Sequence, residues 1–215
     1  MRLVLYYCPH SCATVPWLAL KEAGAPFEVR AVNLPRGEQL TPEYRRINPK
    51  QAVPVLLIDG QPLTENVAIL LWIGRHFAAT RLVPTQPDAE LSMISFLAWC
   101  ASGLHPWLTP NAIPQRYCDL PDSAASVRRC AHKMLQARYA VAEQMLADGR
   151  DWFFGEFSAA DPYFFWAFRR GTQFQVDVSG LPRCRAHLER MQQRASVREL
   201  VAFEQTTLEQ FAKVP

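Results

Sequence analysis

The chain has 215 residues, of which 49% are hydrophobic and 20% are charged, and its formal net charge is +3 at pH 7. This size and balance are typical of a globular protein with one large or two small domains. They exclude the strongly basic composition of a nucleic-acid binder, and no apolar run approaches the roughly 18 residues of a membrane span. Because the first residues lack a signal segment, we expect a cytoplasmic protein with no nucleic-acid or membrane partner.

The first residues of the chain alternate between strand and helix signals. The apolar run 3–7 predicts a short buried strand, and 14–23 predicts a helix that ends at Gly24-Ala25-Pro26. Residues 27–32 alternate between apolar and polar side chains, as in a second strand. Together these segments predict a β-α-β unit.

A polar stretch at 35–49 precedes a predicted hairpin and helix. Residues 53–58 predict a third strand, Asp59-Gly60 predicts a tight turn, and 61–63 predict the return strand. The strongly apolar segment 66–73 predicts a helix that packs on the sheet. We therefore expect two antiparallel strands and a helix after the β-α-β unit.

From about residue 90 onward, strand signals are absent and apolar residues recur at helical spacing. Helices are predicted at 91–104, 123–146, 159–170 and 181–193. The predicted domains are an α/β domain at 1–78 and an all-helical domain at 89–215, joined by a linker at 79–88.

Ser158 and Asp161 stand at the predicted start of the 159–170 helix. We expect Ser158 to accept a hydrogen bond from a backbone N–H of the first turn, and Asp161 to reach back to the cap. This pair is expected to be structural and to have no catalytic role.

The six cysteines are spread through the chain, at positions 8, 12, 100, 118, 130 and 184. A cytoplasmic chain of this size does not depend on disulfides. Three residues separate Cys8 from Cys12, a spacing that fits neither a redox CxxC motif nor half of a zinc site. We expect no disulfide framework and no metal.

Cys12 lies between the first predicted strand and the first predicted helix. A helix N-terminus presents unpaired N–H groups and partial positive charge, which lower a cysteine pKa from about 8.5 into a range of roughly 3.5 to 7.5. A reactive thiolate is one interpretation of this position. The other is a small buried hydrophobe, as most free cysteines are, and position alone does not decide between them.

Four separate motifs now identify a resemblance. They are residues 6–12, residues 47–50 leading to 53–56, residues 63–69 and residues 157–161. In this order and spacing the chain resembles the glutathione transferase family over nearly its full length. Ser11 followed by Cys12 looks most like the bacterial beta class, whose members use cysteine where many relatives use tyrosine or serine.

The resemblance implies a thioredoxin-like glutathione-binding domain followed by an all-helical domain that contributes the acceptor pocket. It implies glutathione as co-substrate, a small electrophilic or disulfide substrate as partner, and a homodimer. By the same resemblance, Cys12, Ser11 and His105 are the candidate catalytic residues. The candidate glutathione-binding residues are Tyr7, Arg36, Lys50, Val53, Pro54, Glu65 and Asn66.

Some of these roles have a specific chemical form. In this fold the proline that matches Pro54 is cis, and Val53 pairs through its backbone with the cysteinyl unit of glutathione. Glu65 would hold the ligand's ammonium, while Asn66 and its N–H would hold the carboxylate at a helix start. The alternative is that Glu65 and Asn66 simply cap the helix. His105 would contact the glutathione sulfur or tune Cys12, or would instead satisfy backbone groups at a helix end.

The expected activity is transfer of glutathione to electrophiles, with thiol-disulfide exchange available because a cysteine faces the sulfur. The alternative function is a glutathione-transferase fold reused as a binding or regulatory module, as in stringent-starvation-type proteins. Those proteins tend to lack the cysteine or the glutathione contacts, whereas this chain has Cys12, Val53-Pro54 and Glu65.

Overall fold

The computed structural model describes residues 1–213. The chain forms two compact units. Within the described residues, one contains Met1–Thr85 together with 193–213, and the other is Gln86–Gln192. Compactness therefore groups the last helix with the sheet, whereas the domain limits at 78 and 89 stay a prediction from the sequence.

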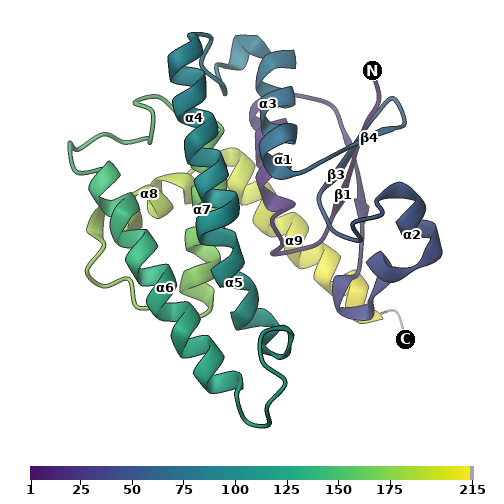
Figure 1. Ribbon diagram of the computed structural model, residues 1–215. Coiled ribbons are helices and arrows are strands. Elements are labelled where there is room, and N and C mark those ends of the chain that lie inside the picture. The colour runs from purple at the N-terminus through teal and green to yellow at the C-terminus, as the bar shows by residue number, and fades with distance from the viewer. Residues whose placement is uncertain (214–215) are drawn as a thin grey trace. The chain divides into compact units, whose positions relative to one another are not determined.

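The first unit contains a four-stranded sheet in the order β2-β1-β3-β4 (Figure 1). The strands are β1 (Leu3–Tyr7), β2 (Glu28–Ala31), β3 (Val55–Ile58) and β4 (Gln61–Thr64). β1 pairs parallel to β2 and antiparallel to β3, which pairs antiparallel to β4. This arrangement confirms the predicted β-α-β unit followed by a hairpin.

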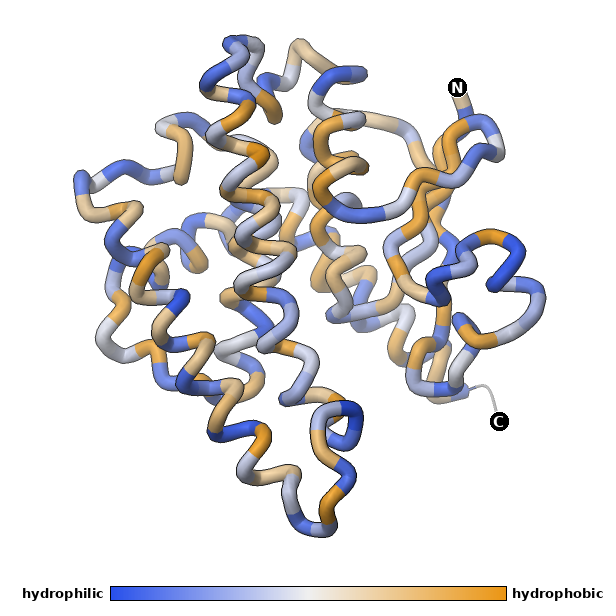
Figure 2. Tube along the Cα trace, viewed as in Figure 1, coloured by the Kyte–Doolittle hydropathy of each residue, from blue (hydrophilic) through white to orange (hydrophobic). Residues whose placement is uncertain are grey.

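Apolar side chains place the sheet in the core of this unit. All five residues of β1 are buried, as are Val55 and Leu56 of β3. Figure 2 shows the hydrophobic colour running along these strands and along α3 (Asn66–His76). α1 (Thr14–Glu22) packs against both α3 and α9 (Ala195–Lys213).

The predicted polar stretch at 35–49 forms short helical turns. These are η1 (Leu34–Arg36), η2 (Glu38–Leu40) and α2 (Pro42–Ile47). The hydroxyl of Thr41 caps α2 by accepting a hydrogen bond from the N–H of Tyr44 at 3.2 Å. A further turn, η3 (Ala78–Thr80), follows α3.

The second unit is helical throughout its regular elements. It consists of α4 (Pro87–Trp99), the π-helical turn η4 (Cys100–Leu104), α5 (His105–Ala112), η5 (Pro114–Arg116), α6 (Ala124–Met145), α7 (Ala160–Gln173) and α8 (Pro182–Gln192). The prediction located α4, α6, α7 and α8; its first helix, 91–104, ran on through η4 and ended before α5, which it missed. Its last helix ended at 193, so it also missed α9.

The capping pair at α7 is confirmed in one half and wrong in the other. Asp161 does reach back, because its Oδ2 accepts from the N–H of Ser158 at 2.8 Å. The Ser158 hydroxyl, however, donates to the same carboxylate at 3.1 Å instead of accepting from the first turn. A hydrogen bond to a charged carboxylate is stronger than one between neutral groups. The Ser158 hydroxyl therefore donates to Asp161 and does not accept from a backbone N–H.

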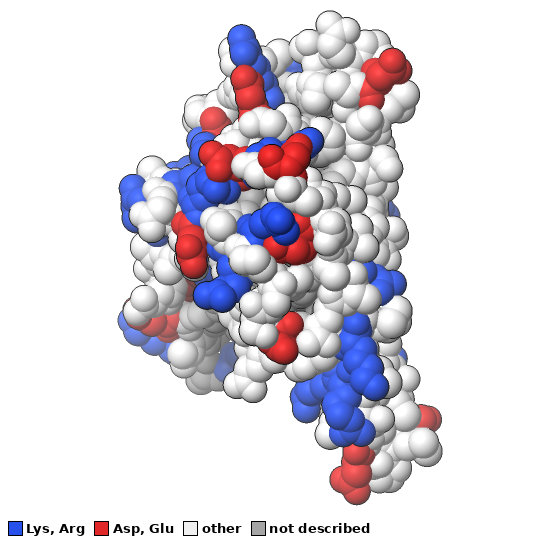
Figure 3. Space-filling view, turned by 90° about the vertical axis from the view of Figure 1, so that its left-hand side faces the viewer, with Lys and Arg blue, Asp and Glu red and all other residues white. Residues whose placement is uncertain are grey.

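The surface charges and the apolar character of the helices can be described for residues 1–213. Arg128, Arg129 and Lys133 on α6 are exposed. Figure 3 shows acidic and basic side chains intermixed over much of the face in view, and a group of basic side chains at its lower right. Within residues 1–213, no helix is long and apolar enough to cross a bilayer. The same residues contain no group of three or more His, Cys, Asp or Glu side chains that could hold a metal ion.

Candidate functional site

Residues 8–13, the Cys12 loop, connect β1 to α1. The Ser11 hydroxyl closes this loop: it donates to the carbonyl of Cys8 at 2.7 Å and accepts from the N–H of Ala13 at 3.2 Å. The backbone N–H of Ser11 bonds to the same Cys8 carbonyl at 3.2 Å. Ser11 therefore shapes the loop, and its hydroxyl proton is already committed to a backbone oxygen.

Cys12 contacts two other predicted site residues, Val53 and Asn66. Its side chain is buried, with 8% of the residue exposed. Its Sγ donates to the carbonyl oxygen of Val53 at 3.4 Å. The Asn66 amide donates to the carbonyl of Cys12 at 3.1 Å. The fold thus brings Cys12, Val53 and Asn66 together from positions far apart in the sequence.

Of the two interpretations of Cys12, the structure favours the buried one. Burial raises the pKa of Cys12 to about 12, and the negative charge of Glu65 acts in the same direction. Hydrogen bonds from the backbone and from the Asn66 side chain favour the thiolate but do not outweigh this desolvation. Cys12 is therefore a protonated thiol at neutral pH.

This protonation state predicts slow alkylation of Cys12 in the absence of ligand. The thiolate is the reactive form and becomes populated as pH rises toward the raised pKa, so the rate climbs about tenfold per pH unit from pH 7 to 9. At pH 7, iodoacetamide labels Cys12 at least about tenfold more slowly than the exposed Cys130 of the same molecules. Peptide mass spectrometry measures both rates. Labelling of Cys12 that is faster than that of Cys130, or that levels off below pH 8, contradicts the protonated state.

Val53 lies in the segment before β3, where hydrogen bonds hold the backbone. The Val53–Pro54 peptide bond is cis, as the resemblance implied. The side chains of Tyr44 and Asn48 both donate to the carbonyl of Ala52, each at 2.8 Å. These two bonds anchor the residue next to Val53.

Glu65 and Asn66 stand at the start of α3, but neither acts as a simple cap. The Glu65 side chain makes no capping hydrogen bond, and the Asn66 amide bonds to Cys12. Glu65 instead accepts from Lys50 Nζ at 2.6 Å, and the same ammonium donates to Thr64 Oγ1 at 3.0 Å. The fold thus pairs Lys50 with Glu65, an interaction that sequence separation did not suggest.

Tyr7, Arg36 and His105, the remaining predicted residues, have contacts of other kinds. The Tyr7 hydroxyl donates to Glu204 on α9 at 3.1 Å. Arg36 is exposed at the end of η1. His105 begins α5 in the helical unit, where its ring packs edge-on against Trp166 at 4.7 Å between centroids. Tyr7 and Arg36 belong to the same unit as Cys12, whereas His105 belongs to the helical unit. The roles of all three stay predictions.

Glu204 is the residue that sequence reasoning missed. Only 2% of it is exposed, and it accepts hydrogen bonds from three residues at the β1–α1 junction. The buried residues of α9 are Ser196, Val197, Leu200, Glu204 and Thr207. Their spacing follows one helix face, so a carboxylate on that face was the available signal.

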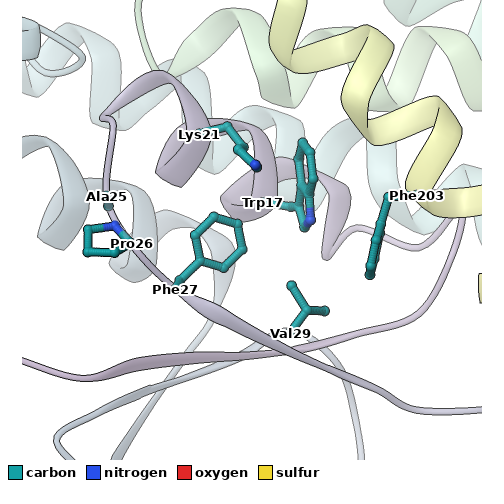
Figure 4. A pocket seen from close by; sticks show the side chains of 7 residues that line it. All are labelled: Trp17, Lys21, Ala25, Pro26, Phe27, Val29 and Phe203. Carbon is teal, nitrogen blue, oxygen red and sulfur yellow. The ribbon is translucent and has the colours of Figure 1, made fainter.

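A separate cavity of about 280 Å³ lies in the sheet-containing unit (Figure 4). It is lined by Trp17, Lys21, Ala25, Pro26, Phe27, Val29 and Phe203. Lys21, its charged member, is paired with Glu199 at 2.8 Å. None of the predicted site residues lines this cavity.

Comparisons with known proteins agree on one family. Residues 7–76 match the family model described as glutathione S-transferase, N-terminal domain. Glutathione S-transferase GstA of Escherichia coli O157:H7 is 28% identical, covering 93% of this chain and 98% of its own length. Glutathione S-transferase GST-4.5 of Xanthomonas campestris pv. campestris is 30% identical, covering 90% and 94%. A solved glutathione transferase homologue from Sulfitobacter, with bound glutathione, superposes with a TM-score of 0.86 at 28% identity, over 94% of this chain and 97% of its own.

Proposed function

Because this chain belongs to the glutathione transferase family, we propose that glutathione lies along the Val53–Pro54 segment with its sulfur facing Cys12. The observation that carries this proposal is the 3.4 Å contact between Cys12 Sγ and the Val53 carbonyl. A peptide that pairs with the backbone of Val53 places its own cysteinyl side chain next to that contact. The Cys12-containing site is of the type described for the beta class.

The two ends of glutathione have complementary partners in this unit. Its γ-glutamyl carboxylate fits the N-terminus of α3, where backbone N–H groups and the helix dipole favour an anion. Its ammonium fits Glu65, whose carboxylate now accepts a hydrogen bond from Lys50 Nζ at 2.6 Å. When the ligand's ammonium replaces that of Lys50 at Glu65, Lys50 can turn to the glycyl carboxylate of the ligand. We assign that carboxylate to Lys50 and Arg36.

The protonated state of Cys12 favours conjugation of glutathione over thiol-disulfide exchange. A neutral S–H donates a hydrogen bond, so it stabilises a glutathione thiolate beside it. The glutathione proton passes to solvent, the thiolate forms a new S–C bond to an electrophilic carbon, and the leaving group departs with its electron pair. In this proposal Cys12 acts as the hydrogen-bond donor to the sulfur of the co-substrate.

Thiol-disulfide exchange is the second candidate, and the presence of a cysteine at this position favours it. The Cys12 thiolate would attack glutathione disulfide, forming a Cys12–glutathione bond and releasing one glutathione thiolate. Because burial raises the pKa of Cys12, this step is slow at neutral pH and accelerates as pH rises. A homodimer and a cytoplasmic location are further proposals that rest on the family resemblance.

The affinity for glutathione tests the proposed contact between Glu65 and the ligand's ammonium. The change Glu65→Gln removes the negative charge that holds the ligand's ammonium, so we expect the Kd for glutathione to rise about tenfold. Calorimetry measures this Kd, and an analogue without the amino group should bind both proteins equally.

The matched control is Glu43→Gln, which removes an exposed carboxylate paired with Arg46 on α2, and it should bind like the unchanged protein. Equal affinity of the Glu65 variant for glutathione argues against the proposed orientation. No detectable binding to the unchanged protein, together with a co-purifying protein, favours the regulatory alternative.

A further inference from the structure

A buried carboxylate on the last helix lies under the Cys12 loop. Glu204 is 2% exposed, and removing a carboxylate from water costs free energy unless hydrogen bonds compensate it. Its Oε1 accepts from the Tyr7 hydroxyl at 3.1 Å, the His10 N–H at 3.0 Å and the Thr14 hydroxyl at 3.4 Å. Its Oε2 lies 3.4 Å from His10 Nδ1. One side chain thus engages three separate residues.

These three residues bracket Cys12 on both sides. Tyr7 ends β1, His10 lies within the Cys12 loop, and Thr14 is the first residue of α1. A single oxygen therefore ties the end of the strand, the middle of the loop and the start of the helix together.

The loop needs such an anchor because its backbone includes an unfavourable conformation. His10 has a φ of 63°, in the left-handed region that non-glycine residues rarely adopt. The hydrogen bond from the His10 N–H to Glu204 holds this residue in place. Without that acceptor, the loop has backbone conformations of lower energy available to it.

α9 is itself fixed along α1 at its other end. Glu22, at the end of α1, accepts hydrogen bonds from Arg194, which directly precedes α9, and from Ser196 in its first turn, in each case at 2.5 Å. Between the two ends, Phe203 stacks on Trp17 with 6.0 Å between ring centroids. Glu204 is therefore presented to the loop by a helix that is anchored independently of it.

We propose that Glu204 is a positioning residue, which holds the Cys12 loop in the geometry that glutathione transfer requires. This inference rests on the proposed function, since it assigns the loop to the reaction. Glu204 does not contact glutathione in this arrangement, because the proposed ligand contacts belong to other segments. Its loss should therefore lower kcat and leave the KM for glutathione nearly constant.

The test compares Glu204→Gln with Glu199→Gln. The first keeps the shape of the side chain and removes its charge, and the second removes an exposed carboxylate of the same helix that pairs with Lys21. We expect Glu204→Gln to lower kcat about tenfold, with KM for glutathione within about twofold, because small displacements of reacting groups carry large rate penalties. Glu199→Gln should match the unchanged protein.

A second measurement separates positioning from a purely structural role. Hydrogen exchange of the amides at 10–14 should accelerate in Glu204→Gln, while exchange at β3 stays unchanged. A lowered melting temperature with an unchanged kcat per folded molecule overturns the inference, as does unchanged exchange at 10–14. Failure of the proposed function can be told apart from failure of the Glu204 inference. If the proposed function is wrong, Cys12→Ala keeps the full rate of glutathione conjugation. Failure of the Glu204 inference leaves Cys12→Ala impaired and Glu204→Gln fully active.

Discussion

Replacing Cys12 by alanine is expected to lower the rate of glutathione conjugation about a hundredfold. The buried thiol donates to the Val53 carbonyl in the ligand-free protein, and we propose that it donates to the glutathione sulfur in the complex. Removing one donor that stabilises a developing or fixed anion costs on the order of 10² to 10³ in rate. The measurement is kcat with a chromogenic electrophile such as a chloronitrobenzene.

Cys12→Ser separates the two candidate activities. A serine hydroxyl remains a hydrogen-bond donor, so conjugation should stay within about tenfold of the unchanged rate. It does not form a disulfide, so incubation with glutathione disulfide should give no adduct at this position. Intact-mass analysis should show the Cys12 adduct in the unchanged protein and not in Cys12→Ser, and more of it at higher pH.

The matched control for both variants is Cys130→Ala, which removes an exposed thiol on α6. It should retain conjugation and adduct formation. Full conjugation activity in Cys12→Ala would remove Cys12 from the reaction. An adduct of equal yield in that variant would assign the exchange chemistry to another cysteine.

Replacing Asp161 by alanine is expected to destabilise the helical unit by about 3 to 5 kcal/mol. This carboxylate is fully buried and accepts from the N–H and hydroxyl of Ser158 and from the N–H of Phe153. It also lies 3.0 Å from Nε2 of the buried His187. Its removal leaves several buried polar groups without their partner, and each such group carries a desolvation penalty.

Urea or thermal denaturation measures this loss, and the melting temperature should fall by roughly 10 °C. Ser158→Ala removes one donor only and should cost about 1 kcal/mol. Asp88→Ala, at an exposed position in the first turn of α4, should leave the transition unchanged. A transition in Asp161→Ala that matches that of Asp88→Ala would show that the buried network does not stabilise the fold.

Short-range patterns were sufficient to predict most of the fold. The alternation at 27–32, the turn at Asp59-Gly60 and the apolar run at 66–73 each depend on neighbours in the sequence, and each matches an observed element. α9 was missed because its buried face includes Ser196, Glu204 and Thr207. Polar residues on the buried side weaken the periodicity from which a helix is predicted.

The resemblance named Cys12, Val53 and Asn66, and the fold brings these three residues together, while their roles stay predictions. The local effect of a helix start offered a low pKa of Cys12 as one interpretation, but burial of the thiol outweighs that effect. The Lys50–Glu65 pair and the Glu204 contacts depend likewise on residues that meet only in the folded chain.

The central claim is that glutathione binds along Val53 with its sulfur at Cys12, and a crystal structure with bound glutathione tests it most directly. The account predicts backbone hydrogen bonds between the ligand and Val53, with the ligand sulfur within about 4 Å of Cys12 Sγ. An unoccupied Val53 segment at saturating glutathione, or a ligand sulfur directed away from Cys12, would contradict it.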